Sequence, residues 1–261
     1  MSHHFRFWLF AFCLSLVSAV SAASSLAADD NFVPKQDVLP VKPPADAVVL
    51  FSGEGEVKNL FLSKDGKECN WTVKNGELIS TTTKEKQNHI VSQYHFRDAD
   101  IHVEFNVDKQ AEGNSGIYIH GLYEMQIYNS ADKKSLNEHD EGSLYGFNKP
   151  LVNAAKKPGE WQVYDIRYRA PRRNEKGEIS EQGEITAWLN GQKVQDKTKF
   201  GEGKSAFHPY RFNTTPYLTT IWDEQKKTLI GPVFLQDHGS PCHFRNVWVK
   251  PLDNQAHMYT P

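Results

Sequence analysis

The chain has 261 residues, of which 39% are hydrophobic, 24% charged and 12% aromatic. Its 30 basic and 32 acidic residues nearly cancel and leave a formal net charge of -2. The aromatic content argues against a wholly disordered chain, and the balanced charge argues against nucleic-acid binding, which usually requires a basic surface. The length is sufficient for one large all-β domain or two small domains.

The first 28 residues are typical of a secretory signal peptide. Arg6 precedes an apolar run over residues 7–20, and small residues follow over residues 21–28. The apolar run is shorter than the roughly 20 residues that span a bilayer. We therefore predict export to the periplasm or the cell exterior rather than a membrane anchor, and no later stretch is long enough to form a membrane span.

Removal of the signal peptide also removes Cys13 and leaves Cys69 and Cys242. An oxidising compartment permits a disulfide between two such cysteines. They lie near opposite ends of the domain, and the terminal strands of a sandwich are often neighbours. The sequence leaves two alternatives open, namely one disulfide or two buried thiols.

An extended leader is predicted for residues 29–46, where four prolines and mixed charges leave little apolar sequence for a core. Short β-branched and aromatic runs, separated by turn residues, then continue over residues 47–252 and predict one β-rich domain. Residues 253–261 are expected to form a C-terminal tail.

Two Asn-Gly pairs give the clearest hairpin signals, at residues 75–76 and 190–191. Residues 170–183 are predicted to form a charged hairpin loop, and residues 201–230 have few strand signals and are predicted to form a long functional loop. No helical period extends beyond two turns. The pattern therefore predicts an all-β sandwich or barrel.

Apolar and polar residues alternate along several of the predicted strands, which places their polar side chains on one face. An ordinary solvated face is rich in Lys, Thr, Ser and Glu. These faces instead carry residue types that are typical of a sugar-binding or catalytic groove. The four polar faces contain His102, Glu104 and Asn106; Tyr118 and His120; Glu124, Gln126 and Tyr128; and Phe234, Gln236 and His238.

Seven short motifs occur in a characteristic order. They are Gly113-Asn114-Ser115-Gly116-Ile117-Tyr118, Tyr123-Glu124-Met125-Gln126-Ile127, Leu144-Tyr145-Gly146, Lys157-Pro158-Gly159-Glu160-Trp161 with Tyr164-Asp165-Ile166, Leu189-Asn190-Gly191, Leu235-Gln236-Asp237-His238-Gly239 and Phe244-Arg245-Asn246-Val247. In order and spacing the chain resembles the 3-keto-disaccharide hydrolase domain family over about residues 46–252. The resemblance implies a concanavalin-like jelly-roll β-sandwich of two antiparallel sheets.

The sequence departs from the family pattern at two places. His120 stands where members often have Arg, and residues 242–245 read Cys-His-Phe-Arg where the last strand often reads Val-Arg-Phe-Arg. These departures bear on substrate choice more than on the fold.

The resemblance implies action on glycosides that are already oxidised at C3 of the sugar ring. A carbonyl at C3 acidifies the C2 proton, so a base can remove that proton, the enolate can expel the C1 substituent, and water can then add. Such a site needs a base, a group that stabilises the enolate and an acid. The catalytic candidates are Glu124, His120 and His238, and Glu124 beside a His could also ligate a divalent metal ion.

A carbohydrate substrate would be bound by further polar and aromatic side chains. Arg245 could hold a charged oxygen, although strand alternation leaves its direction ambiguous, and Trp161 could either stack on a sugar or pack in the core. The substrate-binding candidates are Asn114, Tyr118, Gln126, Tyr145, Trp161, Gln236, Arg245 and Glu104.

The sequence leaves three other functions open. Ordinary glycoside hydrolysis needs two carboxylates across the groove, and Glu104 with Glu124 is the pair that the sequence offers; the absence of an acid two residues after Glu124 counts against it. A non-catalytic, lectin-like carbohydrate-binding module is the second alternative. A structural or interaction domain of the cell envelope is the third.

Overall fold

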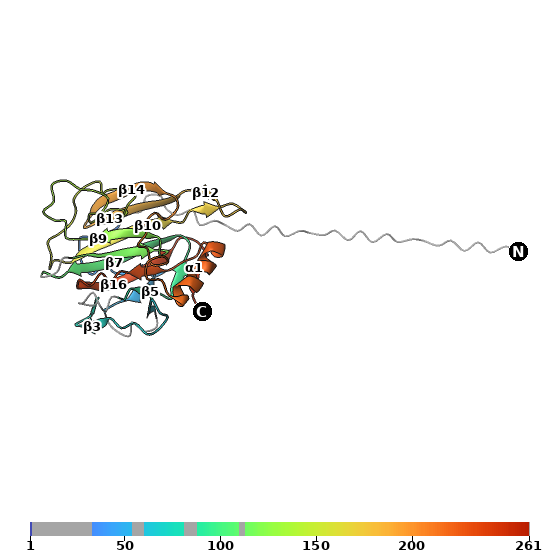
Figure 1. Cartoon of the computed structure of the whole chain (residues 1–261), viewed down its shortest axis with the longest axis horizontal. Coiled ribbons are helices and arrows are strands. Elements are labelled where there is room, and N and C mark those ends of the chain that lie inside the picture. The colour runs from blue at the N-terminus through green and yellow to red at the C-terminus, as the bar shows by residue number, and fades with distance from the viewer. Residues whose placement is uncertain (2–32, 54–59, 81–87, 110–112, 261) are drawn as a thin grey trace.

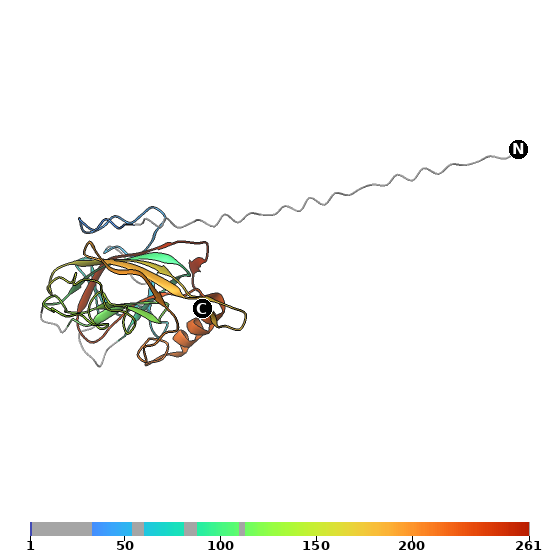
Figure 2. The ribbon, with the colours of Figure 1, turned by 90° about the horizontal axis from the view of Figure 1, so that it is seen from above.

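The computed structural model describes residues 1, 33–53, 60–80, 88–109 and 113–260. The predicted signal peptide falls almost entirely outside these residues. Two antiparallel sheets stack as layers, with a single described helix beside them (Figures 1 and 2). This arrangement confirms the predicted all-β sandwich. Within the described residues, no helix is long and apolar enough to cross a membrane.

The larger sheet has eight strands, of which seven follow one another in hydrogen-bonded order and β1 (Val48–Phe51) pairs with β16. The seven, in spatial order, are β14 (Gln192–Phe200), β13 (Gly183–Leu189), β10 (Gln162–Arg169), β7 (Ala99–Val107), β16 (Cys242–Pro251), β4 (Glu77–Ile79) and β3 (Thr72–Lys74).

The smaller sheet has five strands. In spatial order they are β2 (Phe61–Ser63), β5 (Ile90–Ser92), β15 (Val233–Leu235), β8 (Ser115–Ile119) and β9 (Tyr123–Ile127). Two short ribbons lie outside the sheets: β11 (Arg172–Arg173) pairs with β12 (Ile179–Glu181), and β17 (Ala256–Met258) pairs with β6 (Tyr94–Phe96).

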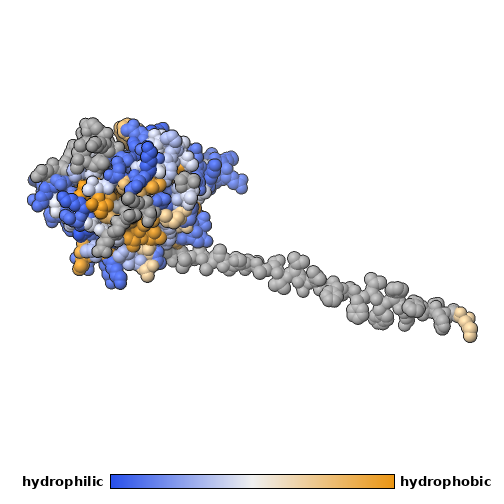
Figure 3. Space-filling view, turned by 90° about the horizontal axis from the view of Figure 1, so that it is seen from below, coloured by the Kyte–Doolittle hydropathy of each residue, from blue (hydrophilic) through white to orange (hydrophobic). Residues whose placement is uncertain are grey.

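The main core lies between the two sheets. On β7 the inward residues include Ile101, Val103 and Phe105, and they join Ile117 and Met125 of the smaller sheet in one apolar cluster. Because side chains alternate along a strand, the polar residues of both sheets point away from this core. Each sheet therefore has its own outward polar face. Most of the surface seen in Figure 3 is hydrophilic, with apolar patches between.

Both predicted Asn-Gly hairpins are present. Asn75 and Gly76 join β3 to β4, and Asn190 and Gly191 join β13 to β14, all four with positive φ angles between 50° and 82°. Two successive left-handed residues match the right-handed twist of a hairpin. The charged loop predicted over residues 170–183 contains the β11–β12 ribbon.

The segment 201–230, predicted as a loop, contains the helix α1 (Pro216–Thr228). Thr215 caps its first turn, since Thr215 Oγ1 accepts a hydrogen bond from the Leu218 amide at 3.3 Å, and Pro216 occupies the first turn. Leu218 and Ile221 pack against Phe234 on the outward face of the smaller sheet. The helix thus covers one half of that face and leaves the other half open.

The two ends of the described chain pack onto the sandwich. Residues 33–46 have no regular structure, as expected of the leader, yet Gln36 is buried against the larger sheet. Within the predicted C-terminal tail, β17 pairs with β6, and Tyr259 is buried.

Cys69 and Cys242 are both free, so the disulfide considered from the sequence is absent and the two-thiol alternative holds. Cys242 is fully enclosed on β16, opposite Val107 of β7, whereas Cys69 is half-buried in the chain leading to Trp71. Burial raises the pKa of both thiols, which keeps them protonated and unreactive.

Candidate functional site

A groove of about 460 Å³ lies on the open half of the smaller sheet's outward face. Strands β8, β9 and β15 supply its floor, and the loops after β9 and after β14 supply its walls. The structure brings seven of the predicted site residues together here. The residues that line the groove are Asn114, Tyr118, Glu124, Gln126, Tyr128, Lys133, Asn137, His139, Tyr145, Ser205, Phe207, Gln236 and His238.

The pairing of β8 with β9 sets the position of the Glu124 side chain. Tyr118 lies directly opposite Glu124, and Gly116 lies opposite Gln126. A Cβ atom at Gly116 would stand 2.3 Å from Glu124 Oε1. The absence of a side chain at Gly116 is therefore what allows the Glu124 carboxyl to lie across β8.

The Glu124 carboxyl is almost completely buried, with 5% of the residue exposed. Burial raises its pKa to about 8, although hydrogen bonds with Tyr118 and Gln236 act in the opposite direction. A buried carboxyl is expected to hold its proton because charge is poorly solvated in an apolar environment. A pKa near neutrality suits a group that must both accept and release a proton.

Tyr118 of β8 and Gln236, the residue after β15, both form hydrogen bonds with the Glu124 carboxyl. Gln236 Nε2 donates a hydrogen bond to the Tyr118 hydroxyl at 3.3 Å. The pKa of Tyr118 is raised well above its usual value by burial and by the nearby Glu124. The phenol therefore stays protonated and acts as a hydrogen-bond donor to Glu124.

Tyr145 lies on the loop that follows β9 and lines the groove beside Glu124. Its amide donates to the Glu124 carbonyl at 2.9 Å, and its ring packs on His139 with 4.7 Å between ring centres. Burial, and then the proximity of Glu124, raises the pKa of its phenol. Tyr145 consequently presents a protonated hydroxyl near Glu124 and at the groove surface.

Two buried amide oxygens in the groove have no protein partner within the described chain, namely Gln126 Oε1 and Gln236 Oε1. A buried carbonyl without a hydrogen bond costs roughly 1–3 kcal/mol. Gln126 and Gln236 both line the groove, but these two oxygens are shielded from solvent. A hydroxylated ligand would therefore contact the other polar atoms of the groove.

His238 stands at the exposed end of the groove, three residues beyond β15. The preceding Asp237 is buried, and its carboxylate accepts hydrogen bonds from the Asn88 and Gly239 amides, both at 2.9 Å. This turn fixes the direction of the chain at His238. A smaller cavity of about 120 Å³ shares Phe207, Gln236 and His238 with the groove and continues it past His89.

The sequence reasoning missed the wall residues Lys133, Asn137, His139, Ser205 and Phe207. All five lie in irregular loops, where no period-2 pattern relates one residue to the next. Only the absence of strand signals in the 201–230 segment pointed to any of them. The residues of the groove wall therefore could not be predicted from the sequence and were identified from the structure.

The expectation that His120 shares a face with Tyr118 is wrong. Strand β8 ends at Ile119, and His120 has a φ of 55°, which turns its side chain out of the strand alternation. Its Nε2 lies 2.7 Å from the Phe96 carbonyl, and its Nδ1 lies 3.2 Å from the Tyr168 hydroxyl. Burial lowers its pKa to about 4, so His120 is a neutral packing residue outside the groove.

Glu104, Arg245 and Trp161 do not lie in the groove either, because they belong to the outward face of the larger sheet. Arg245 Nε donates to Glu104 Oε2 at 2.8 Å, and the guanidinium stacks on Trp161 with 3.9 Å to the ring centre. Alternation correctly separates Glu104 from the core, but it does not reveal which sheet a strand joins.

The leader closes over this second polar face. The Val41 amide donates to Glu104 Oε1 at 2.7 Å, and Gln36 Nε2 donates to Asp165 Oδ2 at 2.6 Å. Between the two acids lies His102, whose Nδ1 is 2.7 Å from Asp165 Oδ1. Every member of this network has a protein partner, and the network is covered, so it is structural.

Among the described residues, Glu124 is the only carboxylate that lines the groove. The pair of Glu104 with Glu124 is excluded as a catalytic pair because the two lie on opposite faces of the sandwich. Within the same residues no three or more His, Cys, Asp or Glu side chains cluster as a metal site would require. The divalent metal ion considered from the sequence stays a prediction.

The fold and the groove define an all-β sandwich domain with an open polar groove. Residues 46–250 match the family model of the 3-keto-alpha-glucoside-1,2-lyase-like domain, and the chain belongs to this carbohydrate-active family. This confirms the resemblance seen in the sequence.

Two solved structures from Parabacteroides distasonis, each described as a candidate glycosyl hydrolase, are similar to this chain. The first is 31% identical, with 80% of this chain and 84% of that chain covered and a TM-score of 0.65. The second is 21% identical, with 79% and 94% covered and a TM-score of 0.54, and shows likeness in fold. A comparison with curated proteins finds no match.

Proposed function

We propose that the protein is an exported enzyme that cleaves glycosides carrying a carbonyl at C3 of the sugar ring. The observation that carries this proposal is a single buried carboxyl, Glu124, with a pKa near 8, in a groove lined by phenol, amide and imidazole groups. The family description and the candidate glycosyl hydrolase relative support the same chemistry.

Glu124 is the base in this proposal. The C3 carbonyl makes the C2 proton acidic, and the ionised Glu124 removes it to leave an enolate whose charge rests on the C3 oxygen. Tyr118 and Gln236 hold the carboxyl in place through their hydrogen bonds. A base with a pKa near the working pH is populated in its ionised form and still accepts a proton readily.

Tyr145 supplies the hydrogen bond to the enolate oxygen. Its phenol stays protonated at neutral pH and lies in the same groove as Glu124, and the C2 proton and the C3 oxygen of the substrate belong to adjacent ring atoms. Preorganised donors aimed at a developing charge are commonly the largest contribution to catalysis.

His238 protonates the leaving group. The enolate collapses to restore the C3 carbonyl, a C1–C2 double bond forms, and the C1–O bond breaks as the departing oxygen takes a proton from His238. Water then adds to C1 of the enone and gives a proton to His238, while Glu124 returns a proton to C2, so that both groups regain their starting protonation states. The net reaction consumes one water and gives the 3-keto sugar and the free alcohol.

The test uses a matched pair of aryl glucosides, one with a carbonyl at C3 and one with a hydroxyl. The wild-type protein should release the phenol from the keto compound and leave the hydroxyl compound intact. Glu124→Gln should reduce release by at least about 100-fold, and His238→Ala by about 10² to 10⁴-fold unless the leaving group is already acidic. Equal cleavage of both glucosides would contradict the proposal.

The alternative is a non-catalytic carbohydrate-binding module. The polar and aromatic lining of the groove favours sugar binding under either function. Saturable binding of keto-glycosides without any release of phenol, equally strong in Glu124→Gln, would support the binding module and exclude the enzyme.

A further inference from the structure

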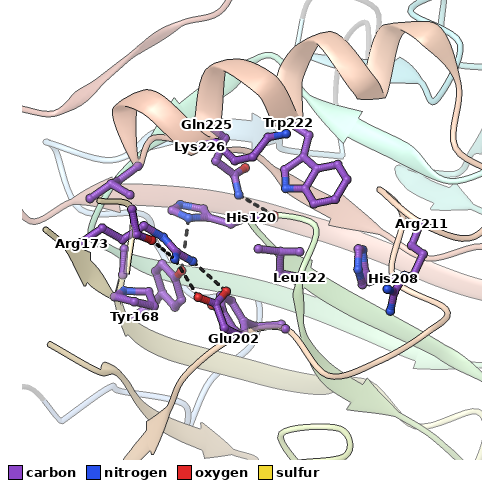
Figure 4. A pocket seen from close by; sticks show the side chains of 16 residues that line it. His120, Leu122, Tyr168, Arg173, Glu202, His208, Arg211, Trp222, Gln225 and Lys226 are labelled. Atoms are coloured by element: carbon purple, nitrogen blue, oxygen red, sulfur yellow. Dashed lines mark hydrogen bonds and ion pairs between the residues drawn. The ribbon is translucent and has the colours of Figure 1, made fainter. Parts of the chain in front are cut away.

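A second cavity, of about 410 Å³, lies between α1, the β8–β9 turn and the β11–β12 ribbon, apart from the groove (Figure 4). We call it the helix-side cavity. Leu122, Pro171, Trp222 and Leu229 contribute apolar surface to it. None of the groove residues lines it, although the segment after β14 supplies Glu202 and His208 to this cavity and Ser205 and Phe207 to the groove.

Most polar groups of the helix-side cavity already have partners. Arg173 makes two hydrogen bonds to the Glu202 carboxylate, at 2.7 and 2.8 Å. Gln225 donates to the His120 carbonyl at 3.0 Å and accepts from the Tyr210 hydroxyl at 3.0 Å. Lys226 lies 2.7 Å from Asp223 on the helix surface. These groups form walls rather than ligand-binding contacts.

One end of the cavity differs, because His208 and Arg211 lie there and make no ion pair within the described residues. The His208 ring contacts Tyr210 and Trp222, and the residue is 4% exposed; its Nδ1 has no hydrogen bond and is shielded from solvent. Arg211 lies beside it in Figure 4 and makes no ion pair within the same part of the chain. Arg211 also acts on His208 electrostatically, since burial first and Arg211 second lower the pKa of the imidazole.

We propose that the helix-side cavity binds a small organic carboxylate with an apolar ring, its carboxylate at His208 and Arg211 and its ring between Leu122 and Trp222. A guanidinium binds a carboxylate through parallel hydrogen bonds, and the buried His208 ring closes the cavity beside it. The remaining walls offer few free hydrogen-bonding groups, so a body with many hydroxyls, such as a sugar acid, would lose hydrogen bonds to water without replacement.

Calorimetric titration of the full-length protein tests this proposal. Benzoate and cinnamate are the ligands; benzyl alcohol, which lacks the charge, and gluconate, which lacks the apolar ring, are the comparisons. Saturable binding of at least one aromatic carboxylate, at least about 10-fold tighter than either comparison compound, is the expected result. No saturation with either aromatic carboxylate, or equal affinity for gluconate, would overturn the proposal.

Variants locate the site. Arg211→Gln should weaken binding of the carboxylate at least about 10-fold, and because Arg211 is exposed the variant should unfold at the wild-type temperature. Lys227→Gln removes the same charge from the outside of α1, away from the cavity lining, and should bind as the wild type does. Equal affinity in Arg211→Gln and Lys227→Gln would exclude this cavity as the site. None of these readouts depends on glycoside cleavage.

Discussion

Burial of the Glu124 carboxyl sets the pH behaviour expected of the folded protein. The pKa of this carboxyl is raised from 4.5 to about 8, so the folded state favours the protonated form. Its contribution to stability is therefore fully present below about pH 4.5 and is lost as the pH rises through about 8. The same ionisation creates the catalytic base, so activity should rise while stability falls.

Glu124→Gln separates these two effects. The amide resembles the protonated carboxyl and cannot ionise, so the variant should become more stable than the wild type as the pH rises from 5 to 9. One pKa unit corresponds to about 1.4 kcal/mol, and we expect at least that difference at pH 9. Thermal melts of both proteins across this range provide the measurement, and a constant difference in melting temperature would contradict the assigned pKa.

Gly116 is predicted to control the position of the same carboxyl. An alanine Cβ would approach Glu124 Oε1 to 2.3 Å, so Gly116→Ala must displace the carboxyl. A displacement of about 1 Å costs roughly 100-fold in rate, whereas overpacking costs stability by about 1–3 kcal/mol. Steady-state kinetics and circular dichroism should show a folded protein with little activity.

Gly201→Ala is the matched control, because the nearest atom to its added Cβ is 3.9 Å away. This variant should keep wild-type activity. If Gly116→Ala were as active as Gly201→Ala, the carboxyl position would not matter for the reaction.

At this scale the sequence predicted the floor of the groove through strand alternation. Tyr118, Glu124 and Gln126 share one face because they belong to regular strands, and Gln236 directly follows β15. His120 breaks the rule, since a left-handed residue at a hairpin reverses the direction of its side chain. The turn determines this positive φ, and the alternation of polar and apolar residues does not predict it.

Among the elements, the leader and the larger sheet are joined by the buried network around His102. Burial opposes a charge on this imidazole, but hydrogen bonds with Asp165 and Glu104 outweigh it and raise the pKa of His102. The stabilisation is fully present below the ordinary pKa near 6.5 and is lost as the pH rises through the raised value. The leader is thus held most firmly at mildly acidic pH.

Asp165→Ala should therefore destabilise the protein by about 3 kcal/mol, the usual cost of leaving one member of a buried charged pair without its partner. Urea unfolding at pH 6 provides the measurement. Asp196→Ala is the control, because its ion pair with Lys193 is exposed, and exposed pairs contribute at most about 1 kcal/mol. Equal losses in the two variants would show that the network contributes no more than a surface pair.

The helix α1 was not predicted, although its cap and first turn are readable as Thr215 followed by Pro216. Its apolar residues Leu218, Ile221 and Trp222 follow a helical spacing, but charged and polar residues dilute the pattern. The helix packs on the outward face of the smaller sheet, a surface that sequence patterns treat as exposed. Packing against the sheet therefore stabilises a helix that the local sequence pattern alone does not specify.

In the whole molecule, the outward faces of the larger and the smaller sheet have similar polar compositions, but only one of them is covered. One is closed by the leader and satisfies its own hydrogen bonds, and the other stays open and leaves two amide oxygens without partners in the described chain. Composition and alternation predicted both faces but could not assign them to different sheets. Topology alone separates Glu104 from Glu124 and with it a two-carboxylate mechanism from a one-carboxylate mechanism.

The state of the cysteines is a further prediction for the molecule as a whole. Both Cys69 and Cys242 are free, so the folded protein should melt at the same temperature with and without a reductant. Alkylation in denaturant without reductant, followed by mass spectrometry, should label both residues. A mass consistent with one unlabelled pair would contradict the structure.

The measurement that tests the central claim most directly follows the C2 hydrogen of the substrate. A 3-keto glucoside labelled with deuterium at C2 is cleaved in ordinary water, and the sugar product is quenched and reduced at once, with an enzyme-free control for spontaneous exchange. Removal of the C2 deuteron by Glu124 predicts that the labelled substrate releases its alcohol more slowly than the unlabelled one, and that part of the deuterium is lost when the Glu124 deuteron exchanges with water before C2 is reprotonated. Equal rates of release from the two substrates, together with full retention of deuterium at C2, would show direct displacement at C1 and would contradict the proposed chemistry.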